Sequence, residues 1–143
     1  MDQPQCQAIE WECTRLINLY ASLNDQGRWE EVAALYAPDG LMTRPTAPDA
    51  PIVGREALLA SFLARPPRAS RHICSNIVVE VESADAARAE SMILLFTGTP
   101  DPSGGLPIAG PPLVGAYHDR FVRTEEGWRF SERRGSLAFR AGA

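Results

Sequence analysis

The chain changes its apolar repeat once, near Pro67, and this change limits the possible folds more than any other feature. Before Pro67, apolar residues recur every three or four positions, which is the repeat of amphipathic helices. After Pro67, they alternate with polar residues, which is the repeat of half-buried strands. Helices in the first half and hairpin-linked strands in the second predict an α+β fold with an antiparallel sheet.

Three helices are expected before Pro67, over residues 9–23, 28–36 and 54–65. The first ends near Gly27, which can take the left-handed conformation of a helix cap. The second is stopped by turn-forming residues at positions 38–40. All three helices carry an apolar face, so we expect them to pack on the sheet.

Two segments of the chain are rich in proline. After a short possible strand at residues 41–43, residues 44–53 hold three prolines and are expected to form an irregular loop. Residues 100–112 combine proline with glycine and predict a second, longer loop. Loops of this length are uncommon unless they have a function, such as covering a pocket.

Four long strands are expected after Pro67, over residues 72–81, 87–97, 113–123 and 128–139. In the first of them the apolar residues occupy odd positions, while the even positions hold His72, Cys74, Asn76 and Glu80. Turn residues at 83–85 and 124–127 join the strands in pairs as hairpins. The pattern predicts a sheet in which each strand has one buried face.

The totals exclude several classes of protein. With 143 residues, the chain fits a single domain spanning residues 1–143. Its net charge is −4 and it contains no long run of like charge, so we expect no nucleic-acid partner. The N-terminal sequence lacks the basic and apolar regions of a signal peptide, and no stretch is long and apolar enough to span a bilayer. We therefore expect a cytoplasmic protein without a membrane partner.

The metal-ligating residue types are sparse. The three cysteines, Cys6, Cys13 and Cys74, form no C-x-x-C pair, so the sequence predicts neither a disulfide framework nor a thiolate metal site. His72 and His118 are the two histidines, which excludes a multi-histidine metal centre. Motifs for dinucleotides, nucleoside triphosphates and serine hydrolases are also missing. We expect no metal and no cofactor.

Five motifs in chain order resemble those of SnoaL-like proteins, a branch of the nuclear-transport-factor-two-like, or cystatin-like, superfamily. They are the segments 19–29 with 35–40, Gly54-Arg55-Glu56-Ala57-Leu58, Arg71-His72-Ile73-Cys74-Ser75-Asn76, 115–121 and 127–133. The resemblance covers nearly the whole chain. It implies three N-terminal helices packed on a strongly curved, mixed but mostly antiparallel sheet, which forms a cone with an internal pocket. It also implies a homodimer through the outer face of the sheet.

The resemblance is nearest to the branch that contains scytalone dehydratase and the bile-acid dehydratase. Those enzymes remove water next to a carbonyl group. Tyr20, Asp25 and His72 fall at positions that match the catalytic residues of this branch. In those dehydratases, the strand after the histidine strand supplies a further acidic or histidine side chain, and here Glu90 is the candidate for that place.

Four further residues are expected to contact a ligand by this resemblance and by their predicted positions: Trp29, Asn76, Tyr117 and Arg133. Trp29 also suits the protein core. Arg133 and Arg134 lie on opposite faces of the last strand, so one of them could enter the pocket and meet an anionic substrate group. The limonene epoxide hydrolases, which share the fold, use an Asp-Arg-Asp site. Asp119 and Arg133 are possible members of such a site here, but its third residue has no counterpart.

The expected chemistry uses three residues. His72 can accept and return a proton near neutral pH, Tyr20 can donate a hydrogen bond to a carbonyl oxygen, and Asp25 can orient His72. Each also has a structural alternative: His72 could be a hydrogen-bonded structural residue, Tyr20 suits core packing, and Asp25 could cap the helix that follows it. His118 and Asp119 cannot form a dyad, because neighbouring residues of a strand point to opposite faces.

Two functions remain open at this point. The first is a cofactor-independent lyase or isomerase that acts on a hydrophobic, polycyclic or aromatic carbonyl compound, with His72, Tyr20 and Asp25 as catalytic residues. The second is a binding module that uses the same pocket as a ligand carrier or accessory subunit. The fold hosts both, so the site has to decide between them.

Overall fold

The computed structural model describes residues 1–140, so residues 141–143 of the expected domain lie outside the described part. Its three helices are α1 (Gln3–Asp25), α2 (Trp29–Ala33) and α3 (Arg55–Leu63). Helix α1 starts earlier than expected because Asp2 and Gln5 form a reciprocal capping box, with bonds of 2.8 and 2.9 Å. None of the helices in this range is long and apolar enough to cross a membrane.

The seven strands form one sheet, in the order β2-β1-β7-β6-β4-β3, and β5 pairs with β4. The strands are β1 (Tyr36–Arg44), β2 (Ala47–Val53), β3 (Ala69–Val81), β4 (Ala86–Thr99), β5 (Ile108–Ala109), β6 (Leu113–Thr124) and β7 (Gly127–Leu137). The β1–β7 pair is parallel and every other pair is antiparallel. The predicted α+β class and the mixed, mostly antiparallel sheet are confirmed.

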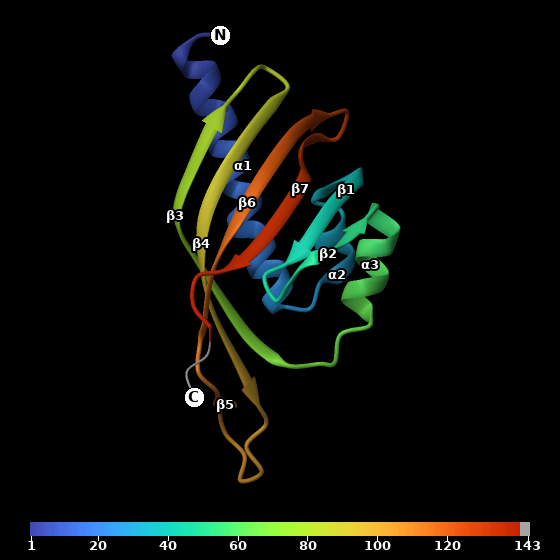
Figure 1. Cartoon of the computed structure of the whole chain (residues 1–143), viewed down its shortest axis with the longest axis vertical. Coiled ribbons are helices and arrows are strands. Elements are labelled where there is room, and N and C mark those ends of the chain that lie inside the picture. Colours follow the sequence, from blue (N-terminus) through green and yellow to red (C-terminus); the bar gives the residue numbers. More distant parts are fainter. Residues whose placement is uncertain (141–143) are drawn as a thin grey trace.

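The strands curve around the long first helix. Strands β3, β4, β6 and β7 sweep across α1, while α2, α3 and the β1–β2 hairpin gather on one side of the molecule (Figure 1). Side chains from α1 and from the concave face of the sheet form the core, with Ile17, Tyr36 and Phe130 fully buried. This shape leaves room for a cavity where the β1–β2 hairpin and the α3–β3 connection approach the long strands.

The prediction of an irregular loop at residues 44–53 was wrong. Residues 47–53 form β2, which pairs with β1 through Leu41↔Val53 and Met42↔Ile52. The two prolines of β2, Pro48 and Pro51, are compatible with a strand because β2 lies at the edge of the sheet, where one side needs no hydrogen-bond donors. The turn expected at residues 38–40 lies inside β1, where the pairing with β7 is irregular.

The long loop at residues 100–112 does not cover the cavity. It contains β5 and extends the end of β4 into an arm that points away from the body of the protein (Figure 1). None of its residues lines the cavity, and Leu113, directly after the loop, does. The arm therefore lengthens the sheet instead of closing the pocket.

A β-bulge in β3 decides which side chains face the cavity. The pairing of β3 with β4 shifts between Ser75 and Val78, and Asn76 in this gap has a φ of 51°. Asparagine tolerates this left-handed conformation better than most residues. Before the bulge, the even-numbered residues of β3 face inward, and after it the odd-numbered residues do. His72 therefore faces inward, on the same side of the sheet as the apolar residues at odd positions after the bulge.

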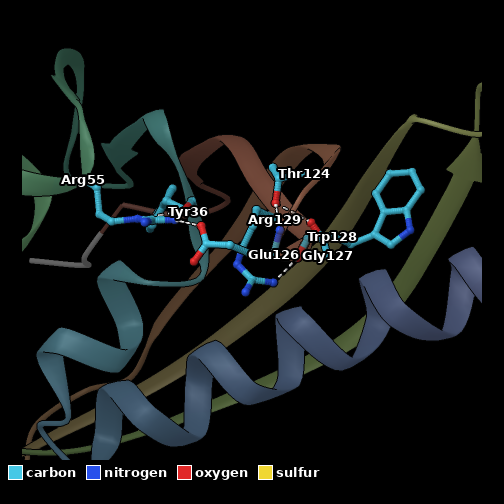
Figure 2. A network of polar contacts seen from close by, with 7 residues as sticks. All are labelled: Tyr36, Arg55, Thr124, Glu126, Gly127, Trp128 and Arg129. Atoms are coloured by element: carbon cyan, nitrogen blue, oxygen red, sulfur yellow. Dashed lines mark hydrogen bonds and ion pairs between the residues drawn. The ribbon is translucent and has the colours of Figure 1, made fainter.

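Away from the cavity, Arg55 joins three parts of the fold (Figure 2). Its guanidinium donates two hydrogen bonds to the main-chain carbonyl of Tyr36, of 2.6 and 3.1 Å, and pairs with Glu126 at 3.1 Å. In the same network, the Thr124 hydroxyl donates to the carbonyl of Gly127 at 2.7 Å and closes the β6–β7 turn. These contacts fix helix α3 and the start of β1 against the β6–β7 hairpin.

Candidate active site

His72 and Asp25 form a close pair. Asp25 is the last residue of α1 and His72 lies near the start of β3. The Nδ1 atom of His72 is 2.6 Å from Oδ1 of Asp25, and both side chains are about nine-tenths buried, with exposures of 8% and 10%. Asp25 also accepts hydrogen bonds from the main-chain N–H of His72 at 2.7 Å and from the hydroxyl of Ser70 at 2.9 Å.

These contacts define the role that Asp25 can have. A carboxylate at the C-terminal end of a helix is unfavourable because the helix dipole is negative there. Asp25 is held in that place by donors from β3 and not by a capping role, since α2 has no side-chain cap. The alternative that Asp25 only caps the next helix therefore has no contact to support it.

The pair also defines the state of the imidazole. Because a carboxylate only accepts hydrogen bonds, the neutral His72 carries its proton on Nδ1 and has a free lone pair on Nε2. Burial lowers the pKa of His72 below its ordinary value, and the hydrogen bond and charge of Asp25 offset part of this effect. At neutral pH the residue is thus an uncharged base.

His72 lines a cavity of about 380 Å³. Its wall combines aromatic, apolar and cationic side chains: Tyr20, Asn24, Met42, Thr43, Arg44, Pro45, Thr46, Arg65, Pro66, Pro67, Arg68, His72, Ile93, Leu95, Leu113 and Tyr117. A volume of this size falls within the range that holds small organic ligands. The cavity brings together three of the predicted residues, Tyr20, His72 and Tyr117.

Tyr20 presents its phenol at the buried end of this cavity. Its hydroxyl is 3.0 Å from that of Tyr36 and 3.8 Å from the sulfur of Met42. Burial raises the pKa of Tyr20 and Tyr36, although the charge of Arg133 partly offsets this, so both phenols keep their protons at neutral pH. When Tyr36 donates to Tyr20, the hydroxyl of Tyr20 donates to the sulfur of Met42, a weak acceptor that a ligand oxygen can replace.

Arg133 is the arginine of the last strand that faces inward. Its side chain is 1% exposed, whereas that of Arg134 is 47% exposed on the outer face. The guanidinium lies over the rings of Tyr117 and Tyr20, at 3.7 and 4.4 Å from their centroids, and donates to Asp119 at 3.0 Å. Arg133 thus supports the two tyrosines from behind and does not itself line the cavity.

Asp119 lies behind the cavity wall with Arg133. Burial raises its pKa to about 6 in spite of the nearby guanidinium, and its Oδ2 has no hydrogen-bond partner among the described residues. His118, its neighbour, points to the outer face and lies 3.2 Å from Glu90. As expected, His118 and Asp119 point to opposite faces of β6.

Five predicted residues do not line the cavity: Asp25 and Arg133, whose contacts are given above, and Trp29, Asn76 and Glu90. Trp29 stacks on Phe62, with ring centroids 5.8 Å apart, and thus packs against the core. Asn76 forms the bulge of β3 and is exposed. Glu90 faces outward with a side-chain exposure of 75%, because the inward positions of β4 are odd and hold Ala89 and Ser91. It cannot supply the further acid that the resemblance suggested for this strand.

Several contributing residues were missed by the sequence interpretation. Ser70 lies two positions before His72 on the same face of β3, and its hydroxyl donates to Asp25. The alternation of the strand could have indicated that Ser70 and His72 share a face. Tyr36 was assigned to the second helix and not to the site. Arg65 and Arg68 lie in the α3–β3 connection, where no periodicity indicates the direction of a side chain, and Arg44 ends β1 within a segment expected to be a loop.

Comparison with known proteins agrees with this architecture. The family model of the SnoaL-like domain matches residues 8–134, which is most of the chain. The chain belongs to the SnoaL-like family. No curated protein matches its sequence.

The solved structures similar to this SnoaL-like chain share its fold. An NTF2-like protein with a cystatin-like fold from Novosphingobium aromaticivorans is 26% identical over 90% of this chain and 80% of that chain, with a TM-score of 0.72. A proposed scytalone dehydratase from the same organism is 23% identical over 96% and 92%, with a TM-score of 0.76. A protein from Catenulispora acidiphila, solved in complex with S-DNPA, is 24% identical over 92% and 94%, with a TM-score of 0.70.

Proposed function

We propose that this SnoaL-like protein is a cofactor-independent lyase or isomerase that moves a proton next to the carbonyl group of a hydrophobic, aromatic or polycyclic molecule. The observation that carries the proposal is the 2.6 Å contact between His72 and Asp25 at the wall of a cavity that Tyr20 also lines. A base, the group that orients it and a hydrogen-bond donor for an oxyanion are the parts that such a reaction needs. The similarity to a proposed scytalone dehydratase is consistent with this class.

The proposed reaction starts when Nε2 of His72 takes a proton from the carbon next to the carbonyl. The electron pair of that C–H bond forms a carbon–carbon double bond, and the carbonyl oxygen becomes an enolate. Tyr20 donates a hydrogen bond to this oxygen and stabilises its charge. Asp25 stabilises the imidazolium that has formed on His72.

The imidazolium then returns the proton. If the proton goes to a hydroxyl group on the next carbon, the enolate electrons expel water and leave a conjugated double bond, which is dehydration. In a substrate with a β,γ double bond the enolate is a dienolate, and a proton that goes to its γ-carbon moves the double bond to the α,β position, which is isomerisation. His72 is a neutral base again in both cases, so the cycle is balanced without a further reactant.

Deuterium exchange tests this proposal before the substrate is known. In D₂O, the protein is expected to exchange the α-hydrogens of ketones that fit the cavity, and mass spectrometry measures the incorporation. We expect His72→Gln to lower the exchange rate about 10²- to 10⁴-fold, the usual contribution of a general base. His118→Gln is the matched control, because it replaces the exposed histidine of the outer face. Equal exchange by the two variants would disprove the role of His72 and favour the binding-module alternative.

We also propose that the protein forms a homodimer through the outer face of the sheet. Ile73, Val78 and Met92 are 51%, 59% and 37% exposed on the neighbouring strands β3 and β4. Exposed apolar side chains on adjacent strands are typical of an interaction surface. Light scattering coupled to size-exclusion chromatography is expected to give twice the mass of the chain, and the Ile73→Glu variant is expected to be monomeric. A monomeric wild-type protein would contradict the proposal.

A further inference from the structure

The charges on the cavity wall are all of one sign. Arg44, Arg65 and Arg68 line the cavity, and no aspartate or glutamate does. The chain as a whole has 18 acidic and 14 basic residues and a net charge of −4, so this wall does not follow the overall composition. We call these three residues the arginine trio. Their position creates a positive potential in an otherwise acidic protein.

The arginine trio has no carboxylate partner within residues 1–140. None of the three forms an ion pair there, although six of the other arginines do: Arg28, Arg55, Arg88, Arg120, Arg133 and Arg134. The buried Nε of Arg44 has no hydrogen-bond partner, and its Nη2 is 3.4 Å from the carbonyl of Ser61. Arg44 therefore keeps donor capacity that the described residues do not use.

Arg65 is held in place by aromatic rings and not by an acid. Its guanidinium lies over the ring of Phe62 at 5.0 Å and over that of Trp29 at 5.6 Å. Burial lowers the pKa of Arg65, and the like charges of Arg44 and Arg68 lower it further. Like charges that repel one another at one wall cost free energy, and a bound anion would offset this cost. Trp29 thus contributes to the site through Arg65.

The arginine trio and the tyrosines lie at different depths of the cavity. Tyr20 and Met42 are each 3% exposed, and they define the buried end. Arg68, Pro66 and Pro67 are exposed and Arg44 and Arg65 are half-buried, so these residues define the open end. Apolar side chains, including Ile93, Leu95 and Leu113, line the rest of the wall. A ligand that fits this gradient has an apolar body and one charged end.

We propose that the arginine trio is an anion subsite, and that the substrate of this site is a hydrophobic carbonyl compound with a carboxylate or phosphate group at the end remote from the reacting carbon. The carbonyl part of this proposal rests on the proposed function, whereas the anion subsite does not depend on it. Guanidinium groups bind both anions through paired, charge-assisted hydrogen bonds. The trio binds the anion at the open end and thereby orients the carbonyl toward Tyr20 and His72.

Three probes that share an acetylnaphthalene body and differ in one end group test the subsite: 6-acetyl-2-naphthoate, its methyl ester, and 6-acetyl-2-naphthyl phosphate. Calorimetry gives their dissociation constants at about 0.05 and 0.5 M NaCl, between which the Debye length falls several-fold. We expect at least one anion to bind about tenfold more tightly than the ester at low salt. The relative affinity of the carboxylate and the phosphate identifies which anion the subsite prefers. Equal affinity of all three probes, or no binding of any, would overturn the proposal.

Two variants connect this preference to the arginine trio. Arg68→Gln removes an exposed charge and is expected to keep the fold, while Arg44→Gln removes the side chain with the unpartnered Nε. Each is expected to weaken anion binding about threefold or more and to leave the ester unchanged. Arg71→Gln, which replaces an exposed arginine of β3 outside the cavity wall, is the matched control. An unchanged anion preference in both variants would overturn the assignment.

Deuterium exchange of the acetyl hydrogens separates this proposal from the proposed function. Tight anion binding that depends on the arginine trio, without exchange in any probe, would leave the subsite intact and contradict the lyase or isomerase activity. Exchange that depends on His72 and is equally fast for ester and anions, with equal affinities, would leave the activity intact and overturn the subsite.

Discussion

Arg55 and the arginine trio carry the same charge in opposite surroundings. The guanidinium of Arg55 contacts the carbonyl of Tyr36 and the carboxylate of Glu126, so the protein itself supplies its acceptors (Figure 2). At the cavity, the arginine trio lacks carboxylate partners among the described residues, and His72 and Tyr20 line the same wall. The network of Arg55 is therefore structural, whereas we infer that the polar groups of the cavity serve a ligand.

This comparison predicts different costs for substitutions in the two regions. Changes at the cavity are expected to lower activity or affinity more than stability, and changes in the Arg55 network are expected to do the reverse.

Together with His72→Gln, Asp25→Asn is expected to have the largest effect. Asparagine keeps the shape but lacks the charge that stabilises the imidazolium, so we expect the exchange rate to fall by up to about 10⁴-fold, as for the orienting aspartate of a serine-protease triad. Because Asp25 raises the pKa of His72, its loss lowers that pKa further and moves the acid limb of the pH profile to lower pH. Exchange rates measured from about pH 4 to 8 check both points.

Ser70→Ala is the control for this variant. It removes one hydrogen bond to Asp25 and leaves the contact of Asp25 with His72 in place. We expect a loss of a few-fold with an unchanged acid limb. A loss as large as that of Asp25→Asn would mean that the position of Asp25, and not its charge, is decisive.

Tyr20→Phe is expected to have the next largest effect. It removes the donor to the enolate oxygen and keeps the ring under Arg133, so we expect the exchange rate to fall about 10²-fold. The free energy of unfolding is expected to fall by only about 1 kcal/mol, because the hydroxyl of Tyr36 loses one partner. Urea denaturation measures this change. A variant that exchanges at the wild-type rate would exclude Tyr20 as the oxyanion donor.

Arg55→Gln tests the other region. The loss of a charged donor to the Tyr36 carbonyl is expected to lower the free energy of unfolding by about 1–3 kcal/mol. Exchange activity of the folded variant is expected to stay within about twofold of wild type. An activity loss without a stability loss would show that the two regions are not separate in function.

The smallest effect is expected from Glu126→Gln. Glu126 pairs with Arg55, but its side chain is 53% exposed, so solvent screens the ion pair. We expect the free energy of unfolding to change by less than about 1 kcal/mol. Comparison with Arg55→Gln in the same denaturation series separates the contribution of the carbonyl from that of the ion pair.

The order of helices and long strands could be predicted from the sequence because each has a clear apolar repeat. Strand β2 could not, since it is an exposed edge strand whose prolines resemble those of a loop. The bulge at Asn76 could not be predicted either, because polar and apolar residues alternate on both sides of it. Its sign in the structure is the left-handed φ of Asn76, where the inward-facing positions change from even to odd. This one residue decides that His72 points inward.

The candidate site could be predicted in part. Tyr20, Asp25, His72 and Tyr117 were identified from motifs, and the structure brings Asp25 to His72 through a contact between residues 47 positions apart. The sequence does not identify Ser70, Tyr36 and the arginine trio, because their roles depend on tertiary contacts and, for Arg65 and Arg68, on an irregular connection. Glu90 had the right chemistry for a site residue but lies on the outer face.

The most direct test of the account is an NMR titration of the two histidines with ¹⁵N-labelled imidazoles. We expect His72 to be neutral at pH 7, to carry its proton on Nδ1 and to titrate below the ordinary histidine pKa of about 6.5, because burial disfavours its charged form. His118, on the outer face, identifies the second set of signals through the His118→Gln variant. A His72 that titrates above this value, or that carries its proton on Nε2, would contradict the central claim that a free base faces the cavity.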